Sequence, residues 1–110
     1  MNVLTGNKDA DLIILDKLDD KDLLSFCIVN QDANRLCSID SFWRNRLVKK
    51  YGYQNKSKDK TWKQFYLSIL KYWDDDMDIA MYNAAEGGHQ DLVNFFISKG
   101  ADYWLSLIHI

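Results

Sequence analysis

Residues 84–102 read AAEGGHQDLVNFFISKGAD, and they hold the clearest structural signal in the chain. Gly87 and Gly88 adopt left-handed backbone conformations at less cost than residues with a Cβ, so the pair predicts a tight turn between two helices. Gly100, directly behind the cation Lys99, predicts the end of the second helix. Between these glycines, four apolar residues recur at helical spacing: Leu92, Val93, Phe96 and Ile97.

The same stretch resembles the turn and second helix of an ankyrin repeat. The likeness covers residues 76–102, with Met81 in place of the family's first leucine and Ile79 and Ala80 in place of Thr-Pro. An ankyrin unit buries its apolar face only against neighbouring units, and about three units are needed for independent stability. The chain shows one. The residues that carry the resemblance are Ala84, Ala85, Gly87, Gly88, His89, Gly100, Ala101 and Asp102.

Composition favours a helical protein. The chain has 110 residues, 47% of them hydrophobic, which suffices for one ordinary core or for two small units sharing one. The chain has no proline and only five glycines, so it is poor in the residues that form the turns of strand-rich folds. An all-α fold is therefore expected. No apolar run approaches the roughly 18 residues of a membrane span, and no signal peptide is recognisable, so neither membrane insertion nor secretion is expected.

Two short helices joined by an acidic turn are expected near the N-terminus. Asp9 or Asp11 could cap the first helix. Apolar residues occupy more than one side of each helix, in the runs LIIL at 12–15 and LLSFCIV at 23–29. Helices this apolar need cover on two sides, either from another helix of the chain or from a partner protein.

The order of these residues resembles an F-box over roughly residues 4–52. The matching features are the apolar first helix, the Leu-Asp-x-x-Asp-Leu motif at 18–23, and the later Val29-Asn30 and Phe42-Trp43-Arg44. The family's opening Leu-Pro is missing, and residues 5–9 read TGNKD instead. The resemblance implies docking on a Skp-type adaptor that recruits a cullin-RING ubiquitin ligase, while the rest of the chain captures an unknown protein substrate. The two helices carry more apolar residues than one internal core requires. We therefore expect the adaptor contacts at Leu12, Ile13, Leu18, Leu23, Leu24 and Cys27.

The combination of both segments, in a chain rich in Asn, Lys, Asp and aromatic residues, resembles the F-box and ankyrin proteins of giant DNA viruses that infect amoebae. Such proteins are taken to redirect the host ubiquitin system. The resemblance therefore implies an intracellular protein of the host cytoplasm. An ankyrin-type binding scaffold without a link to ubiquitin is the alternative.

Four segments are expected along the chain: an F-box-like domain at 1–52, a mobile polar loop at 53–60, a linking amphipathic helix at 61–75 and a single ankyrin-like repeat at 76–110. Thr61 can cap the linking helix, whose aromatic stripe is expected to pack on both neighbours, with a ligand cradle as the lesser possibility. The apolar residues 103–110 are expected either to fold back as a cap or to promote self-association. The stripe consists of Trp62, Phe65, Tyr66, Ile69, Leu70 and Trp73.

The net charge is only −2, but the central segment of the chain is strongly basic. Residues 44–63 carry eight basic side chains and one acidic side chain, while both flanking segments are acidic. These cations alternate with Tyr51, Tyr53 and Trp62, so nucleic-acid binding through the segment is the rival hypothesis. Cations at a helix end and in a loop are nevertheless ordinary solvated surface, and nucleic acid is the weaker interpretation.

Neither catalysis nor a metal site is expected. Cys27 lies between Phe26 and Ile28 rather than in the polar, partly exposed setting of a nucleophilic thiol. The two cysteines form no Cys-x-x-Cys pair and are expected to be buried and reduced. The acidic run at 74–78 lacks the ligand spacing of a calcium loop, and the histidines and cysteines lack that of a zinc site. No glycine-rich phosphate loop is present, so no cofactor is expected.

Overall fold

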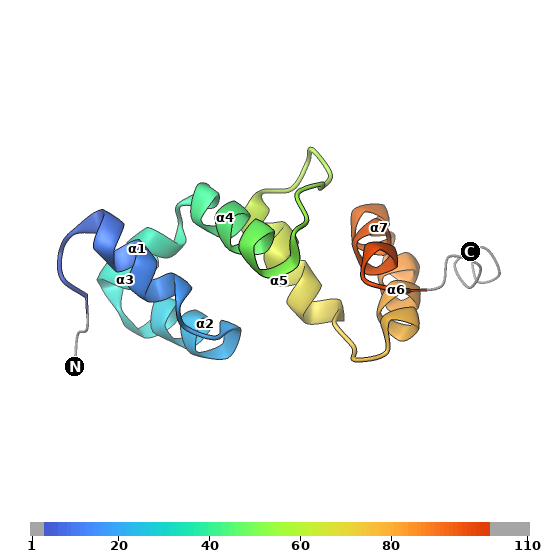
Figure 1. Cartoon of the computed structure of the whole chain (residues 1–110), viewed down its shortest axis with the longest axis horizontal. Coiled ribbons are helices and arrows are strands. Elements are labelled where there is room, and N and C mark those ends of the chain that lie inside the picture. The colour runs from blue at the N-terminus through green and yellow to red at the C-terminus, as the bar shows by residue number, and fades with distance from the viewer. Residues whose placement is uncertain (1–3, 102–110) are drawn as a thin grey trace.

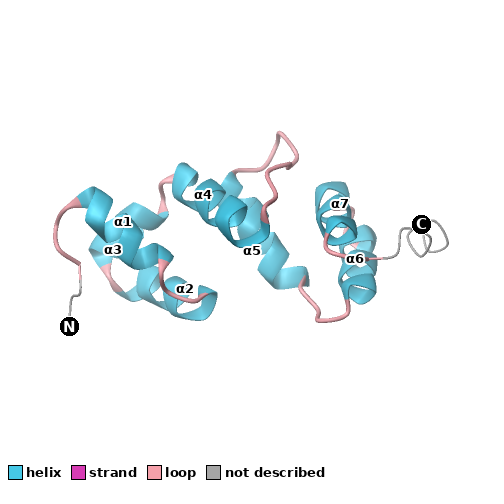
Figure 2. Cartoon of the chain, viewed as in Figure 1, coloured by secondary structure: helices cyan, strands magenta, loops and turns pink. Residues whose placement is uncertain are grey.

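The computed structural model describes residues 4–101. Every regular element in that range is an α-helix, which confirms the all-α class expected from the sequence (Figure 2). Among these helices, none combines the length and the apolar character that crossing a bilayer requires. The helices are α1 (Lys8–Asp16), α2 (Asp20–Val29), α3 (Gln31–Cys37), α4 (Asp40–Tyr51), α5 (Trp62–Tyr72), α6 (Met77–Glu86) and α7 (Gln90–Ser98).

The helices form three groups along the length of the molecule (Figure 1). α1, α2 and α3 pack together at one end, α4 and α5 form the middle, and the hairpin of α6 and α7 forms the other end. The principal extents are 51 × 25 × 21 Å. In this elongated arrangement the middle pair contacts both ends, α4 against α3 and α5 against the hairpin.

The start of α1 differs from the expectation. Asn7 is its N-cap, with the side-chain oxygen accepting a hydrogen bond from the backbone N–H of Ala10. Neither Asp9 nor Asp11 serves as the cap. Asp11 instead lies buried within α1, where its carboxylate accepts hydrogen bonds from the backbone N–H and the hydroxyl of Thr5.

A disulfide links α2 to α3 within the N-terminal group. Cys27 and Cys37 have their Cα atoms 6.1 Å apart and are joined through their sulfur atoms. The expectation of reduced thiols is therefore wrong, although both residues are buried as predicted. The main-chain oxygen of Cys37 also accepts a hydrogen bond of 2.7 Å from the indole N–H of Trp43, which ties the end of α3 to α4.

The aromatic stripe of α5 packs on the helix before it, α4, and on the C-terminal hairpin after it, as the sequence predicts. Thr61 caps the helix in a capping box. On one side the ring of Tyr66 lies 5.3 Å from that of Trp43. On the other side the ring of Phe65 lies 6.3 Å from that of Phe95 in α7. These aromatic contacts connect α4, through α5, to the C-terminal hairpin.

The turn between α6 and α7 uses its two glycines in different ways. Gly88 has a φ of +76°, which is the left-handed conformation that the sequence predicts. Gly87 has a φ of −78°, so its left-handed expectation is wrong. A Cβ at Gly87 would lie 2.9 Å from the hydroxyl oxygen of Tyr72, so a larger residue at this position would require the Tyr72 side chain to shift. Gly100 follows α7 with a φ of +110°, whereas Asp102 and the tail at 103–110 lie outside the described residues.

Candidate protein-docking surface

The six residues predicted to contact an adaptor occupy α1, the turn after it and α2. Ile13 is 59% exposed on α1. Leu23 and Cys27 are only 0% and 7% exposed, so neither lies on an open docking surface, contrary to the expectation. Leu23 and Cys27 are four residues apart, so they share one face of α2, and that face packs into the core. The remaining three, Leu12, Leu18 and Leu24, are half-buried against the core.

The end of α2 carries two docking candidates that the sequence analysis did not single out. Ile28 is 81% exposed and Val29 is 78% exposed, which makes them the most open large apolar residues in the described part of the chain. The available signal was the run LLSFCIV at 23–29, which is apolar on every side of the helix. That run does not say which side faces inward, and in the structure Cys27 is buried whereas Ile28 and Val29 are exposed.

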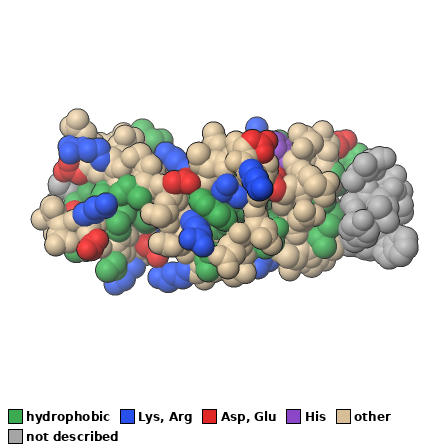
Figure 3. Space-filling model, turned by 90° about the horizontal axis from the view of Figure 1, so that it is seen from above, with side chains coloured by type: hydrophobic (Ala, Val, Ile, Leu, Met, Phe, Trp, Pro, Cys, Tyr) green, Lys and Arg blue, Asp and Glu red, His purple; other side chains and the backbone are tan. Residues whose placement is uncertain are grey.

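A groove of about 210 Å³ lies between α1 and α4. Its apolar lining comes from Leu12, Ile13 and Phe42, so it offers a place for an apolar side chain of a partner. The polar members of the lining are Asp16, Lys17, Ser41, Asn45 and Lys49. Hydrophobic atoms are visible among charged ones over this end of the molecule in Figure 3.

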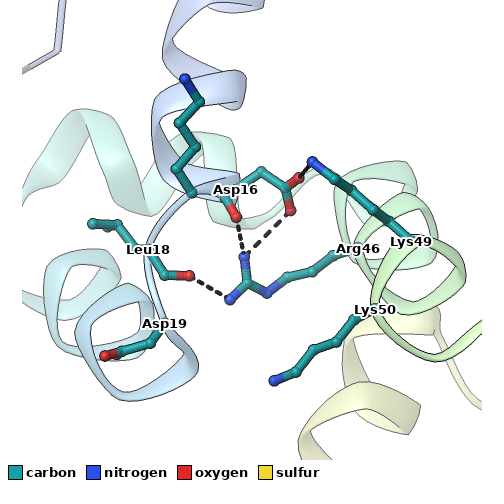
Figure 4. Close-up of a pocket in the computed structure, with 7 residues that line it drawn as sticks. Asp16, Leu18, Asp19, Arg46, Lys49 and Lys50 are labelled. Carbon is teal, nitrogen blue, oxygen red and sulfur yellow. Dashed lines mark hydrogen bonds and ion pairs between the residues drawn. The ribbon is translucent and has the colours of Figure 1, made fainter.

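Beside this groove lies a larger hollow of about 420 Å³, whose floor is the side chain of Arg46 (Figure 4). The guanidinium donates to the main-chain oxygen of Asp16 at 2.8 Å and to that of Leu18 at 2.6 Å. It also lies 3.0 Å from the Asp20 carboxylate and 3.0 Å from the hydroxyl of Tyr66. A single arginine of α4 thereby holds the turn between α1 and α2.

Burial and pairing set the charges of this junction. Burial would raise the pKa of the Asp20 carboxyl, but hydrogen bonds from Lys50, Tyr66 and Arg46 and attraction to Lys50 outweigh it and bring the pKa below the ordinary value of 3.8. Burial, together with the hydrogen bond to Asp20, raises the pKa of Tyr66 above the ordinary value for tyrosine. The carboxylate therefore stays ionised and the phenol stays neutral at pH 7.

The Leu-Asp-x-x-Asp-Leu motif has a structural role in this chain. Asp19 is the N-cap of α2 and accepts a hydrogen bond of 2.8 Å from the backbone N–H of Asp22. Leu18 supplies a carbonyl to Arg46, and Leu23 is a core residue. The motif thus fixes the angle between α1 and α2 rather than presenting its own leucines to a partner.

Half of the cations in the basic segment are neutralised by carboxylates of other elements. Arg46 and Lys49 pair with Asp16, Lys50 and Arg46 pair with Asp20, and Lys60 pairs with Asp91. This pairing leaves less positive charge for a nucleic-acid backbone than the composition suggests. No carboxylate within the described residues forms an ion pair with the other four cations, Arg44, Lys56, Lys58 and Lys63.

The ankyrin-like turn is fastened to the polar loop. Lys60 donates to the Asp91 carboxylate at 2.9 Å and to Nδ1 of His89 at 3.2 Å, and the backbone N–H of Ser57 donates to Asp91 at 3.1 Å. The loop expected to be mobile thus has several contacts with the start of α7. Of the ankyrin signature residues, Ala84 and Ala101 are buried and Ala85 is half-buried.

Within residues 4–101, no group of three or more histidine, cysteine, aspartate or glutamate side chains is placed to hold a metal ion.

Comparison with known proteins adds no family to the structural findings. No protein-family model matches the chain, and searches of curated proteins and of solved structures give no match.

Proposed function

We propose that the chain is a non-catalytic protein-interaction module of the F-box type, which docks on a Skp-type adaptor through its N-terminal helices. The observation that carries the proposal is the exposure of Ile28 and Val29 at the end of α2, at 81% and 78%. Two adjoining β-branched residues left open to water in a small helical unit favour a partner surface. Ile13, at 59% exposed, and the groove beside it add apolar area on α1.

The rigidity of this end of the molecule supports the same proposal. α1 and α2 are held by Arg46, and α2 is linked to α3 by the disulfide. A preorganised helical surface loses less entropy on binding than a flexible one. The link to a cullin-RING ligase, and a place in the cytoplasm of an infected cell, rest on the sequence resemblance at residues 4–52 and 76–102.

The test is the affinity of the 110-residue chain for a Skp-type adaptor, measured by calorimetry. The wild-type chain should bind, and the double variant Ile28→Asp/Val29→Asp should bind at least about tenfold more weakly, because two apolar contacts are replaced by charges. Ile79→Asp is the matched control. Ile79 is 46% exposed on α6, at the far end of the molecule, and its replacement should leave the affinity unchanged.

Circular dichroism should show the same helical content for all of these variants, since surface substitutions cost little stability. If the wild-type chain ignores the adaptor, the F-box proposal is lost and the ankyrin-type scaffold without a ubiquitin link takes its place. If the double variant binds as well as the wild type, the docking surface lies elsewhere.

A further inference from the structure

The four basic side chains without an ion-pair partner belong to one region of the molecule. Arg44 is on α4, Lys56 and Lys58 are in the loop before α5, and Lys63 is in the first turn of α5. In Figure 3, lysine and arginine side chains surround hydrophobic atoms near the middle of the molecule, on the side of this loop. The single acidic residue of the loop, Asp59, accepts a hydrogen bond from the hydroxyl of Ser57.

Trp62 organises two of these cations. The Nζ atom of Lys56 lies 5.0 Å from the centroid of the Trp62 ring, and the guanidinium carbon of Arg44 lies 5.9 Å from it. Cation–π attraction of this kind helps to hold the charged groups in place, and Lys56 also donates a hydrogen bond of 3.3 Å to the main-chain oxygen of Ser57. Arg44 has one further contact, a hydrogen bond of 3.4 Å to the side chain of Gln54. The indole is thus the platform for two oriented donors.

The ring contacts favour an acidic peptide over nucleic acid as the ligand. Nucleic-acid surfaces of this type need open aromatic faces on which bases stack. Trp62 instead carries cations over its ring, while Tyr51 and Tyr53 pack against Phe95 with centroids 5.3 Å and 5.1 Å apart. The basic segment therefore offers oriented cations rather than stacking platforms. Carboxylates are ligands that such cations bind directly, and the fork of an arginine can hold one with two bonds.

We infer that Arg44, Lys56 and Trp62, with Lys58 and Lys63 beside them, form a second interaction surface, which binds an acidic peptide segment of a partner protein. The geometry suits an extended segment, because every second side chain of such a segment points to the same face and alternate carboxylates can then reach Arg44 and Lys56. This surface lies on α4, α5 and the loop between them, away from the exposed end of α2. It does not depend on adaptor docking.

Fluorescence anisotropy with labelled probes tests the inference on the full chain. The probes are a short peptide rich in Asp and Glu, its counterpart with Asn and Gln, and an oligothymidine. The acidic peptide should bind, with an affinity that falls as salt rises, and the Asn/Gln peptide should not. The double variant Arg44→Gln/Lys56→Gln should weaken binding of the acidic peptide roughly tenfold.

Lys71→Gln is the matched control. Lys71 is an exposed cation at the other end of α5, 5.5 Å from the ring of Tyr72, and its loss should leave the affinity for the peptide unchanged. Equal weakening by both variants would mean general charge attraction and would overturn the inference. So would the absence of peptide binding, or tighter binding of the oligothymidine at the same residues. Adaptor affinity measured on Arg44→Gln/Lys56→Gln should equal that of the wild type, which separates the two surfaces.

Discussion

The guanidinium of Arg46 lies 3.0 Å from the carboxylate of Asp20, and this contact joins the middle of α4 to the first residue of α2. Arg46 is 5% exposed and also holds the carbonyl of Leu18. A buried cation, rather than apolar packing alone, therefore sets the orientation of the two helices that we propose as the docking surface.

Loss of the Arg46 contacts should strongly lower the stability of the fold. Arg46→Met should lower the free energy of unfolding by about 3 kcal/mol, because the Leu18 carbonyl loses its arginine partner inside the protein and the Asp20 carboxylate keeps only Lys50 and Tyr66. Urea denaturation measures the loss. Lys49→Gln serves as the control, since Lys49 pairs with Asp16 from a side chain that is 76% exposed, and its loss should stay below about 1 kcal/mol. Similar losses for both variants would contradict the structural role of Arg46.

The Asp20 carboxyl also predicts the response to acid. Its pKa is lowered in the folded state, so the unfolded chain binds more protons than the folded chain as the pH drops below the ordinary value of 3.8. Stability from this group is complete above that value and is lost as the pH falls through the lowered pKa. Urea midpoints measured from pH 6 to pH 2.5 should therefore fall less steeply for Asp20→Asn than for the wild type. Parallel curves would refute the assignment.

The two glycines of the hairpin turn should respond differently to alanine. Gly88→Ala should cost about 1 kcal/mol through its positive φ, whatever surrounds it. Gly87→Ala has an ordinary φ but brings a Cβ to 2.9 Å from the hydroxyl oxygen of Tyr72. The cost of Gly87→Ala should therefore shrink in a Tyr72→Phe background, while that of Gly88→Ala should not. Thermal melts of the double-mutant cycle measure this coupling.

The Cys27–Cys37 disulfide closes a short loop, with a sequence separation of 10 residues. Its reduction should lower the free energy of unfolding by about 2–3 kcal/mol, through the greater freedom of the unfolded chain. Denaturation with and without a phosphine reductant measures the loss. Since the cytosol keeps most thiols reduced, the proposed intracellular setting favours free thiols at Cys27 and Cys37 over the disulfide. Free thiols can be trapped by rapid alkylation as the cells are opened and then counted on the unfolded protein. The count shows whether the cell contains the reduced or the disulfide form. Two free thiols there would mean that the docking helices work without the link.

The local features of the fold were predictable from the sequence. The helix cap at Thr61 and the period of the aromatic stripe in α5 are both set by neighbouring residues. Local patterns of this kind need no knowledge of tertiary structure.

The main errors concern contacts between distant parts of the chain. Arg46 resembled one more solvated cation of the basic segment, and nothing near it in sequence reveals the Leu18 carbonyl, 28 residues away. For α2, which is apolar all round, its own sequence does not distinguish the inner residues Leu23 and Cys27 from the outer residues Ile28 and Val29. Packing against α3 makes that choice.

Hydrogen–deuterium exchange on the chain with and without a Skp-type adaptor tests the docking proposal most directly. We expect slower exchange in peptides covering α1 and α2, residues 8–29, with no change in those covering α6 and α7. Protection confined to the α6–α7 hairpin, or no protection at all, would contradict the docking proposal.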